Sequence, residues 1–281
     1  MNYILFIAGA QGLQTLQEFL KYSHQILVVV PNGFSNEAIE KICYENHLEL
    51  IVRHKGVPLD ISAHNIDLLV SSEFPFKIDP YEYESVCHAL NIHASILPTY
   101  KGRHSDVWSL INDEKTLGVT VHRLNERFDD GEVLYIAEFE INDSLTLREI
   151  YQLAVSKIPI IVSMINDRTI FSQDEAKPRP DIYWRVRTLN DSIINWHLGA
   201  RKVFLFVRAL SRPPIYAYSF YEGVKYEFRN VQFIDQVIEA LPGSVIELDR
   251  HLHIVCGDGR LVKPIDVHSN DIPLAQGIVL H

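Results

Sequence analysis

Asparagine, histidine and aspartate side chains that could stabilise an oxyanion and move a proton occur at two places in this sequence. Asn91 and His93 are two residues apart, and Asp129 follows His93 by 36 residues in the sequence Asp129-Asp130-Gly131. An amide and an imidazolium can donate hydrogen bonds to an oxyanion, and a carboxylate can accept a proton. Taken singly, a histidine at a strand end is more often structural and an Asp-Gly pair more often a turn.

The elements that must position these residues follow from the first third of the chain. Short apolar runs predict strands at residues 3–8, 25–30, 48–52 and 67–70, and the stretches between them predict helices at residues 13–19 and 36–44. This alternation favours βαβ units and a mainly parallel, Rossmann-like α/β sheet. The run Ile26 to Val30 is continuous and mostly β-branched, which is expected of a strand with helices on both faces.

Asn91 and His93 fall in a further predicted strand, residues 89–93, where side chains two apart share one face. A helix is expected at residues 105–111, and strands at residues 117–124 and 132–141 enclose the acidic loop. The longest helical pattern runs over residues 144–165, with Ser144 as its capping signal.

A proline-rich segment indicates where two domains join. The sequence Lys177-Pro178-Arg179-Pro180-Asp181 forbids regular structure and predicts domains of residues 1–180 and 181–281. The second domain is expected to contain a helix at residues 199–210, stopped by Pro213-Pro214. Short strands are then expected at residues 216–221, 226–233, 243–248, 251–256 and 260–267. Five short strands separated by turns predict a small β-barrel.

Composition and charge narrow the class of protein. With 281 residues, 47% of them hydrophobic and 22% charged, the chain is typical of a folded globular protein, so disorder, collagen and coiled coil are excluded. The net charge is −10, and residues 182–281 hold 11 basic and 10 acidic residues. Neither domain is therefore a basic platform, and nucleic acid is an unexpected partner.

The sequence also argues against several cofactors and locations. Cys43, Cys87 and Cys256 are far apart, which indicates a reducing compartment, and no signal peptide or membrane span is recognised, so we expect a cytoplasmic protein without membrane contact. No histidine grouping has metal-site spacing. Gly9 and Gly12 do not complete G-x-G-x-x-G, so they favour a tight strand-to-helix turn over a dinucleotide site.

The motifs around Asn91 and His93 resemble those of the folate-dependent formyltransferase family. The segment Asn91-Ile92-His93-Ala94-Ser95-Ile96-Leu97-Pro98 is similar to the family's Asn-x-His followed by a Ser-Leu-Leu-Pro type turn, with Ile96 replacing the usual first leucine. Further segments agree in family order, namely residues 100–103, 111–114, 117–122 and 128–134. An ordered set of this kind is much more specific than any single motif.

The resemblance implies catalytic roles for Asn91, His93 and Asp129, which match the family's catalytic positions one by one. When an amine attacks a formyl carbon, the amide and the imidazolium would stabilise the oxyanion, and Asp129 would orient the imidazole and help to carry the proton. Asp130 stands where many relatives have a small residue, so whether it shares the role of Asp129 stays open.

The resemblance further implies 10-formyltetrahydrofolate as the formyl donor; the histidine spacing already predicts no metal. In relatives the pterin pocket is lined by the loop after the fourth strand and by the loop that holds the aspartate. The residues predicted here to bind the donor are Phe74, Pro75, Phe76, Ser95, Leu97, Arg127 and Phe128. Core packing is an equally good interpretation of Phe74 and Phe76.

The C-terminal part is similar to the small open β-barrel, OB-like in type, that methionyl-tRNA and amino-sugar formyltransferases append to the catalytic domain. Glycinamide ribonucleotide transformylases normally lack it, so that branch is disfavoured. Leu241-Pro242-Gly243-Ser244-Val245 is among the segments that carry the similarity. Family habit also implies a possible homodimer formed through this region.

The acceptor follows from charge and from the loop after Pro98, which has no long basic insertion for a tRNA acceptor stem. A nucleotide-linked amino sugar needs only a local cation, an aromatic ring and polar groups. Lys101, Arg103, His104 and Trp108 are the predicted substrate-binding residues, with a solvated loop and a buried tryptophan as the alternative.

The sequence therefore favours a sugar N-formyltransferase of surface polysaccharide biosynthesis, such as lipopolysaccharide O-antigen. The alternatives that stay open are a methionyl-tRNA formyltransferase, a hydroxyornithine formyltransferase, a formyltetrahydrofolate hydrolase and, as the weakest, a non-catalytic folate-binding protein.

Overall fold

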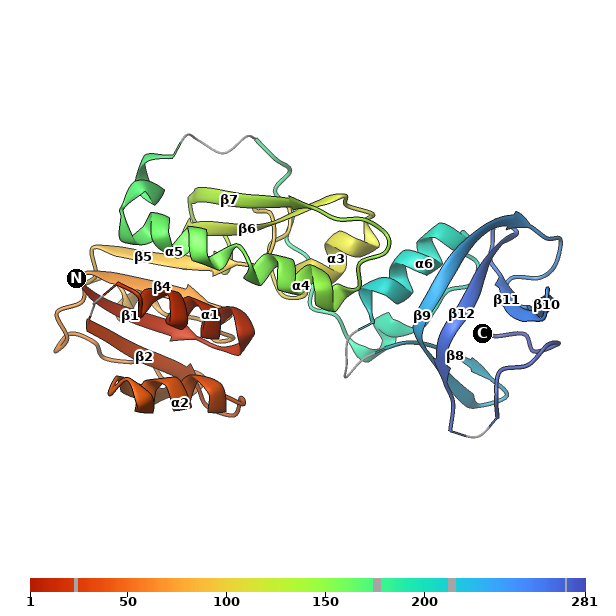
Figure 1. Cartoon of the computed structure of the whole chain (residues 1–281), viewed down its shortest axis with the longest axis horizontal. Helices are drawn as coiled ribbons and strands as arrows, with labels where there is room; N and C mark the ends of the chain where they lie inside the picture. Colours follow the sequence, from red (N-terminus) through yellow and green to blue (C-terminus); the bar gives the residue numbers. More distant parts are fainter. Residues whose placement is uncertain (23–24, 174–177, 212–215, 271) are drawn as a thin grey trace. The chain divides into compact units, whose positions relative to one another are not determined.

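A computed structural model describes residues 1–22, 25–173, 178–211, 216–270 and 272–281 (Figure 1). The chain forms two compact units. Unit 1 comprises Met1–Gly102, Thr116–Glu140 and Tyr151–Trp184, and unit 2 comprises Arg103–Lys115, Ile141–Ile150 and Arg185–His281. Both units are therefore assembled from segments that are far apart in the sequence.

Unit 1 is built on a seven-stranded sheet in the order β3-β2-β1-β4-β5-β6-β7. The strands are β1 (Asn2–Ile7), β2 (Gln25–Pro31), β3 (Glu49–Arg53), β4 (Leu68–Ser72), β5 (His88–His93), β6 (Thr116–Arg123) and β7 (Val133–Glu140). The first five run parallel, whereas β6 is antiparallel to β5 and β7 to β6. The predicted mainly parallel, Rossmann-like sheet is confirmed.

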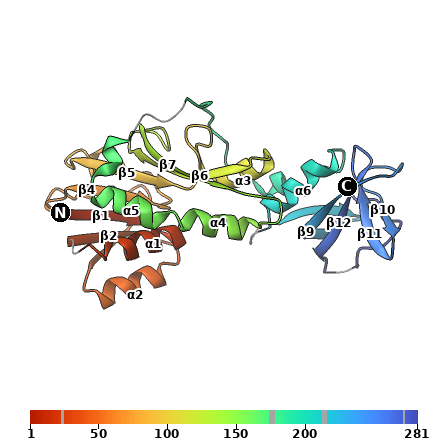
Figure 2. The ribbon, with the colours of Figure 1, turned by 45° about the horizontal axis from the view of Figure 1, so that its top comes forward.

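Helices pack against one set of strand side chains in unit 1. These are α1 (Gly9–Phe19), α2 (Glu37–Glu45), α4 (Leu147–Val155), α5 (Ile158–Asn166) and the short 3-10 helix η2 (Thr169–Ser172). Helices α1 and α5 lie side by side in both views (Figures 1 and 2). The apolar residues that they contribute form one buried cluster with alternate residues of β2, Ile26, Val28 and Val30.

The other residues of β2 pack against irregular segments, so the expectation of helices on both faces of this strand is wrong. Leu27 and Val29 pack in a second cluster with Ile61 and Ile78. These partners come from the irregular segments 54–67 and 73–87, whose only helical element is the 3-10 helix η1 (Pro80–Glu82). A continuous apolar run reports that a strand is buried on both faces but cannot say what buries it.

The turn after β1 has the form predicted for Gly9 and Gly12. Gly9 has a φ of +60°, and a Cβ at Gly12 would lie 2.9 Å from the Cβ of Ile7, so α1 packs closely on the sheet. The Glu73 carboxylate lies at the N-terminus of α1, where its Oε2 accepts hydrogen bonds from Gln11 N at 3.1 Å and from a tyrosine hydroxyl. A carboxylate of the chain thus occupies the place where a Rossmann helix would receive a phosphate.

The long helix predicted for residues 144–165 is wrong in two respects. It is divided into α4 and α5, because Pro159 has no amide hydrogen and its ring obstructs the carbonyl four residues earlier; it lies in the first turn of α5, where it is tolerated. The cap is Thr146 instead of Ser144. Thr146 Oγ1 accepts a hydrogen bond from Glu149 N at 3.3 Å, and Glu149 Oε2 accepts one from Thr146 N at 2.8 Å, which is a capping box.

Unit 2 contains a five-stranded antiparallel sheet in the order β10-β11-β12-β9-β8. The strands are β8 (Ala217–Tyr221), β9 (Val224–Val237), β10 (Val245–Leu248), β11 (His251–Val255) and β12 (Arg260–His268). Helix α6 (Ala200–Ala209) packs on β9 and β12 and also on α3 (Ser105–Ile111), and η3 (Leu189–Ser192) is a short 3-10 helix. All five strands expected in this region are present. They are drawn in blue in Figure 1.

The expected domain boundary after residue 180 stays a prediction. Lys177 of the proline-rich segment and the Pro213-Pro214 pair expected to stop the next helix lie outside the described residues. The segment that follows pairs with unit 1, since Ile182 N donates to Pro98 O at 3.1 Å. No helix in the described ranges is both long and apolar enough to cross a membrane.

Candidate active site

Strand pairing places Asn91 next to a second, buried histidine. Asn91 on β5 is the register partner of His122 on β6, and Asn91 Nδ2 lies 3.0 Å from His122 Nε2. His122 Nδ1 lies 2.8 Å from the carbonyl oxygen of Arg123. Because a carbonyl only accepts hydrogen bonds, Nδ1 carries the proton and Nε2 accepts one from the asparagine amide. His122 therefore orients the Asn91 side chain.

His122 is held in its neutral form. Burial lowers the pKa of its imidazole to about 4, although the nearby Asp129 carboxylate acts in the opposite direction. The exposed fraction of its side chain is 1%. His122 lies in one of the family-like segments, but no role was predicted for it, because its pairing with Asn91 depends on the register between β5 and β6.

His93 and Asp129 come together as the sequence predicted. His93 Nδ1 lies 3.4 Å from Asp129 Oδ1, and His93 Nε2 lies 3.0 Å from the carbonyl oxygen of Tyr100. Both partners are hydrogen-bond acceptors, an arrangement that accommodates an imidazolium. In this structure His93 Nε2 is therefore directed toward the backbone carbonyl of Tyr100.

Asp129 is positioned by backbone contacts on two sides of its loop. Its Oδ2 accepts a hydrogen bond from Gly102 N at 2.9 Å, and its φ of +54° places it in the left-handed region. Two residues later, a Cβ on Gly131 would lie only 1.7 Å from the carbonyl oxygen of Arg123. The glycine in Asp129-Asp130-Gly131 is therefore required, because the loop crosses β6 at backbone contact distance.

The neighbouring Asp130 pairs with Lys101. The Lys101 ammonium contacts the carboxylate of Asp130 and lies 2.7 Å from Asp181 Oδ1. Burial lowers the pKa of Lys101, but hydrogen bonds to the two carboxylates outweigh burial and raise it above its usual value. The same contact with Lys101 lowers the pKa of Asp130. Lys101 was also predicted to bind the acceptor. The ion pairs do not test that role, which stays a prediction.

The residues predicted to bind the donor divide into packed and exposed sets. Phe74 packs edge to face on Phe6, with ring centroids 5.3 Å apart, and on Phe76 at 5.6 Å. Core packing thus accounts for Phe74. Pro75 is half-buried between the two phenylalanines in sequence, whereas Arg127 and Phe128 are exposed.

Ser95 and Leu97 are both buried and support the turn before the cis peptide Leu97-Pro98. Ser95 Oγ donates to Tyr100 O at 2.7 Å, and Leu97 N donates to Thr120 Oγ1 at 3.1 Å. The side chains of Ser95 and Leu97 therefore organise the loop. Any contact between this turn and the formyl donor would come from backbone groups.

Three predicted substrate-binding residues belong to unit 2. Arg103 and His104 are exposed, and the Trp108 indole Nε1 donates to Arg185 O at 3.0 Å. The guanidinium groups of Arg185 and Arg187 lie 5.5 and 5.4 Å from the Trp108 ring centroid. Neither arginine was predicted from the sequence, although the alternation Trp184-Arg185-Val186-Arg187 just after the proline-rich segment was a signal for them.

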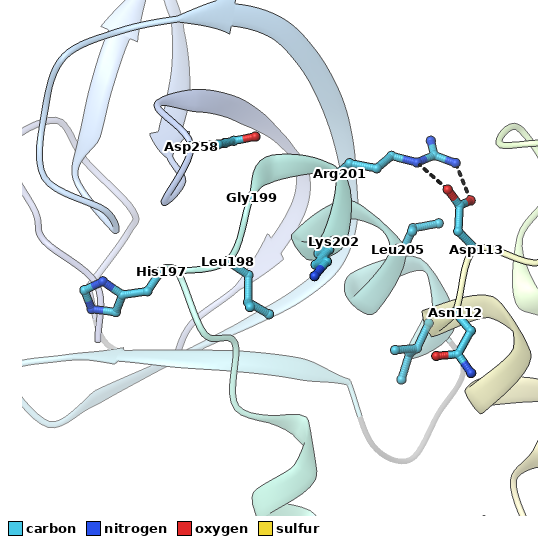
Figure 3. A pocket seen from close by; sticks show the side chains of 10 residues that line it. Asn112, Asp113, His197, Leu198, Gly199, Arg201, Lys202, Leu205 and Asp258 are labelled. Carbon is cyan, nitrogen blue, oxygen red and sulfur yellow. Dashed lines mark hydrogen bonds and ion pairs between the residues drawn. The ribbon is translucent and has the colours of Figure 1, made fainter.

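Unit 2 also contains a cavity of about 700 Å³, shown in Figure 3. Its lining residues are Ile111, Asn112, Asp113, His197, Leu198, Gly199, Arg201, Lys202, Leu205 and Asp258. Arg201 is already paired there with Asp113, at 2.6 Å. None of the predicted site residues lines this cavity. Within the described ranges, no group of three or more metal-ligating side chains comes together.

Two family models match this chain. Residues 60–160 match the model described as formyl transferase, and residues 187–267 match the model described as formyl transferase, C-terminal domain. The first match contains Asn91, His93 and Asp129, and the second covers most of the antiparallel sheet.

Solved structures of sugar N-formyltransferases have a similar fold. WlaRD, a sugar 3N-formyl transferase studied with dTDP and 5-N-formyl-THF, is 20% identical with a TM-score of 0.75, covering 97% of this chain and 99% of that one. An N-formyltransferase from Helicobacter canadensis in complex with folinic acid and dTDP-3-aminofucose is 18% identical with a TM-score of 0.74, covering 94% and 98%. A sugar N-formyltransferase from a Shewanella species is 20% identical with a TM-score of 0.67, covering 82% and 96%. At these identities the likeness establishes the fold.

Proposed function

This chain belongs to the formyl transferase family, and we propose that it transfers the formyl group of 10-formyltetrahydrofolate to the amine of a nucleotide-linked amino deoxysugar. The observation that carries the proposal is the pairing of His93 Nδ1 with Asp129 Oδ1 at 3.4 Å, next to Asn91 on the same strand. These are the residue types that amine formylation requires.

In the proposed transfer the amine nitrogen forms a bond to the formyl carbon, and the bond from that carbon to the folate nitrogen breaks. The reaction therefore needs an oxyanion to be stabilised, a proton to be removed from the amine and a proton to be given to the departing folate nitrogen. Asn91 would donate a hydrogen bond to the oxyanion through the amide that His122 orients, an effect of about 3 kcal/mol for one such donor. Asp129 would keep the imidazole of His93 aligned and help to carry the amine proton. His93 Nε2 would have to exchange its contact with Tyr100 O for the oxyanion.

The donor is proposed to be a folate, in keeping with the family and with the ligands named for two of the similar structures. Arg127 and Phe128 fit such a ligand, because their side chains are exposed and offer a cation and an apolar ring. Phe76, half-buried at the edge of the Phe74 pair, offers a second ring edge. A bound folate supplies the activated formyl carbon; the chain supplies its orientation.

The acceptor is proposed to carry a nucleoside diphosphate. Arg103, His104 and Trp108 stay our candidates for it, and Arg185 joins them because its guanidinium lies over the Trp108 ring. The first sugars to test are dTDP-linked, because the H. canadensis protein was solved with dTDP-3-aminofucose. We place the reaction in the cytoplasm, in surface polysaccharide synthesis, a proposal that the three free cysteines support.

Mass spectrometry tests this proposal directly. The protein is incubated with 10-formyltetrahydrofolate and a panel of dTDP-, UDP- and GDP-linked 3-amino and 4-amino sugars, with His93→Ala as the matched control. We expect a gain of about 28 Da, the mass of CO, on one acceptor and none with the variant.

The other outcomes identify the alternatives. Donor consumed with formate released and no sugar modified would favour the hydrolase. Formylation of initiator methionyl-tRNA or of hydroxyornithine would replace the acceptor, and folate binding without turnover would indicate a binding protein.

A further inference from the structure

We propose that Lys101 is a positioning residue that holds Asp129 in its working place through the neighbouring Asp130, and that it does not bind the acceptor. The inference rests on the proposed function, because Asp129 acts there as the catalytic carboxylate.

The surroundings of Lys101 leave its ammonium little room for a substrate. The residue is 5% exposed, and its Nζ contacts Asp130 and, at 2.7 Å, Asp181. A buried ammonium requires carboxylates or other acceptors to offset the loss of its hydration. Of the two, Asp130 is the more enclosed, with 28% of its side chain exposed against 67% for Asp181. The inner contact therefore ties Lys101 to the loop of Asp129.

The backbone on either side of Lys101 contacts both catalytic side chains. Tyr100 O lies 3.0 Å from His93 Nε2, and Gly102 N donates to Asp129 Oδ2 at 2.9 Å. The three consecutive residues Tyr100, Lys101 and Gly102 thus bind His93, Asp130 and Asp129 in that order. A shift of the 100–102 segment would move the carboxylate relative to the imidazole.

The conformation of Asp129 explains why an ionic contact is useful here. Its φ of +54° lies in the left-handed region, which aspartate tolerates better than most residues but adopts less readily than the right-handed or extended regions, so contacts on both sides of Asp129 help to hold this conformation. Gly131 holds one side by its contact with the backbone of Arg123. Lys101 holds the other side, one residue from the strained position. At neutral pH both partners are charged, since contact with Lys101 lowers the pKa of Asp130.

Steady-state kinetics distinguish positioning from binding. Lys101→Met keeps the aliphatic stem and removes the ammonium, and Asp181→Asn is the matched control that removes only the exposed partner. We expect kcat to fall about 10- to 100-fold in Lys101→Met and in Asp130→Asn, with both KM values within about twofold of wild type. Asp181→Asn should stay near wild type, and Lys101→Arg should recover part of the loss.

Because Lys101 and Asp130 act as one contact, the double variant should be no worse than the poorer single variant. A rise in the acceptor KM with kcat unchanged would assign Lys101 to acceptor binding and overturn the proposal.

An activity-independent measurement separates this inference from the proposed function. Hydrogen exchange of the Gly102 amide reports its bond to Asp129 in the protein alone. We expect that amide to exchange at least about tenfold faster in Lys101→Met and Asp130→Asn, with the amides of β1 unchanged. Unchanged exchange at Gly102 would refute the positioning role, and so would equal acceleration of every amide, which marks a general loss of stability. If wild type formylates nothing, the proposed function fails, and the exchange result still decides the role of Lys101.

Discussion

At the scale of single residues, a neutral histidine determines how the proposed oxyanion donor is presented. His122 accepts a hydrogen bond from Asn91 Nδ2 and donates one to Arg123 O, so its tautomer and the asparagine orientation are set together. His93 lies two residues from Asn91 on β5, and its Nδ1 is 3.4 Å from Asp129 Oδ1 in the acidic loop. The sequence was enough to single out Asn91, His93 and Asp129 as candidate catalytic residues. His122 was identified only by the register between β5 and β6.

Substitution at the histidine-aspartate pair should abolish most turnover without unfolding the protein. His93→Ala removes the imidazole, and Asp129→Asn leaves the loop but removes its negative charge. We expect each to lower kcat by about 10²- to 10⁴-fold, the usual contribution of a positioned proton-transfer group. Turnover is measured by formyl transfer and folding by circular dichroism. Near-normal rates in either variant would remove that residue from the mechanism.

Stability should fall as the pH is lowered from about 6.5 toward 4, in part because of His122. Its pKa in the folded protein is about 4, below the ordinary 6.5, so between these values the unfolded chain binds the proton and the folded chain does not. The contribution of His122 to the free energy of unfolding is therefore fully present above pH 6.5. It decreases by up to about 3 kcal/mol as the pH is lowered to 4. Asp129 and Asp130 favour the protonated form, while burial and His93 oppose it.

Urea unfolding of wild type and of His122→Gln over a series of pH values checks this prediction. The other histidines are present in both proteins, so their contributions cancel in the difference between the two. The variant should show a shallower dependence in this interval. Identical slopes for the two proteins would show that His122 does not titrate as stated.

At the level of secondary-structure elements, the sequence pattern predicted the bounds of an element well where no second signal, such as a proline, interrupted the apolar periodicity. The helix at residues 105–111 was predicted with the bounds that α3 has, and β5 differs from its expected range by one residue. The helix over residues 144–165 was not, because apolar periodicity continues across Ser156 and Lys157 while Pro159 interrupts the hydrogen bonds. Periodicity reports which face is buried, and backbone hydrogen bonding decides where a helix stops.

The cap of α4 offers a stability test of that correction. Thr146→Ala removes the hydroxyl that accepts from Glu149 N, so we expect a loss of about 1 kcal/mol in the free energy of unfolding. Ser144→Ala is the control, because Ser144 N and Oγ both donate to Asn142 Oδ1, which lies outside α4. Urea unfolding measures both. A larger loss for the serine variant would restore Ser144 as the cap.

At the scale of the whole molecule, each unit combines segments that the linear pattern assigned elsewhere. Arg103–Lys115 and Ile141–Ile150 belong with the C-terminal residues in unit 2, although they flank strands of unit 1. Inside unit 2, Arg201 on α6 pairs with Asp113 and with Asp143, which come from these two segments. Such pairing between distant segments is invisible in a sequence read from one end to the other.

Self-association is the prediction that belongs to this scale. We expect light scattering to give about twice the 32.3 kDa mass of one chain. Unit 2 exposes large apolar side chains, including Leu241 at 71% and Ile265 at 53%, that a partner copy could cover. Ile265→Glu should then shift the mass toward the monomer, while Glu247→Gln, on the same sheet, should leave it unchanged. A wild-type monomer over the accessible concentrations would exclude the dimer.

Apolar periodicity and short motifs are local properties of the chain, so they were enough to predict the α/β class, most of the strands, and Asn91 and His93 as candidates on β5. The folded chain was needed to show that Lys101 pairs with Asp130, that His122 orients Asn91 and that irregular segments cover one face of β2. Those relations depend on strand register and on loop paths between residues that are 29 or more positions apart, and no local pattern records them.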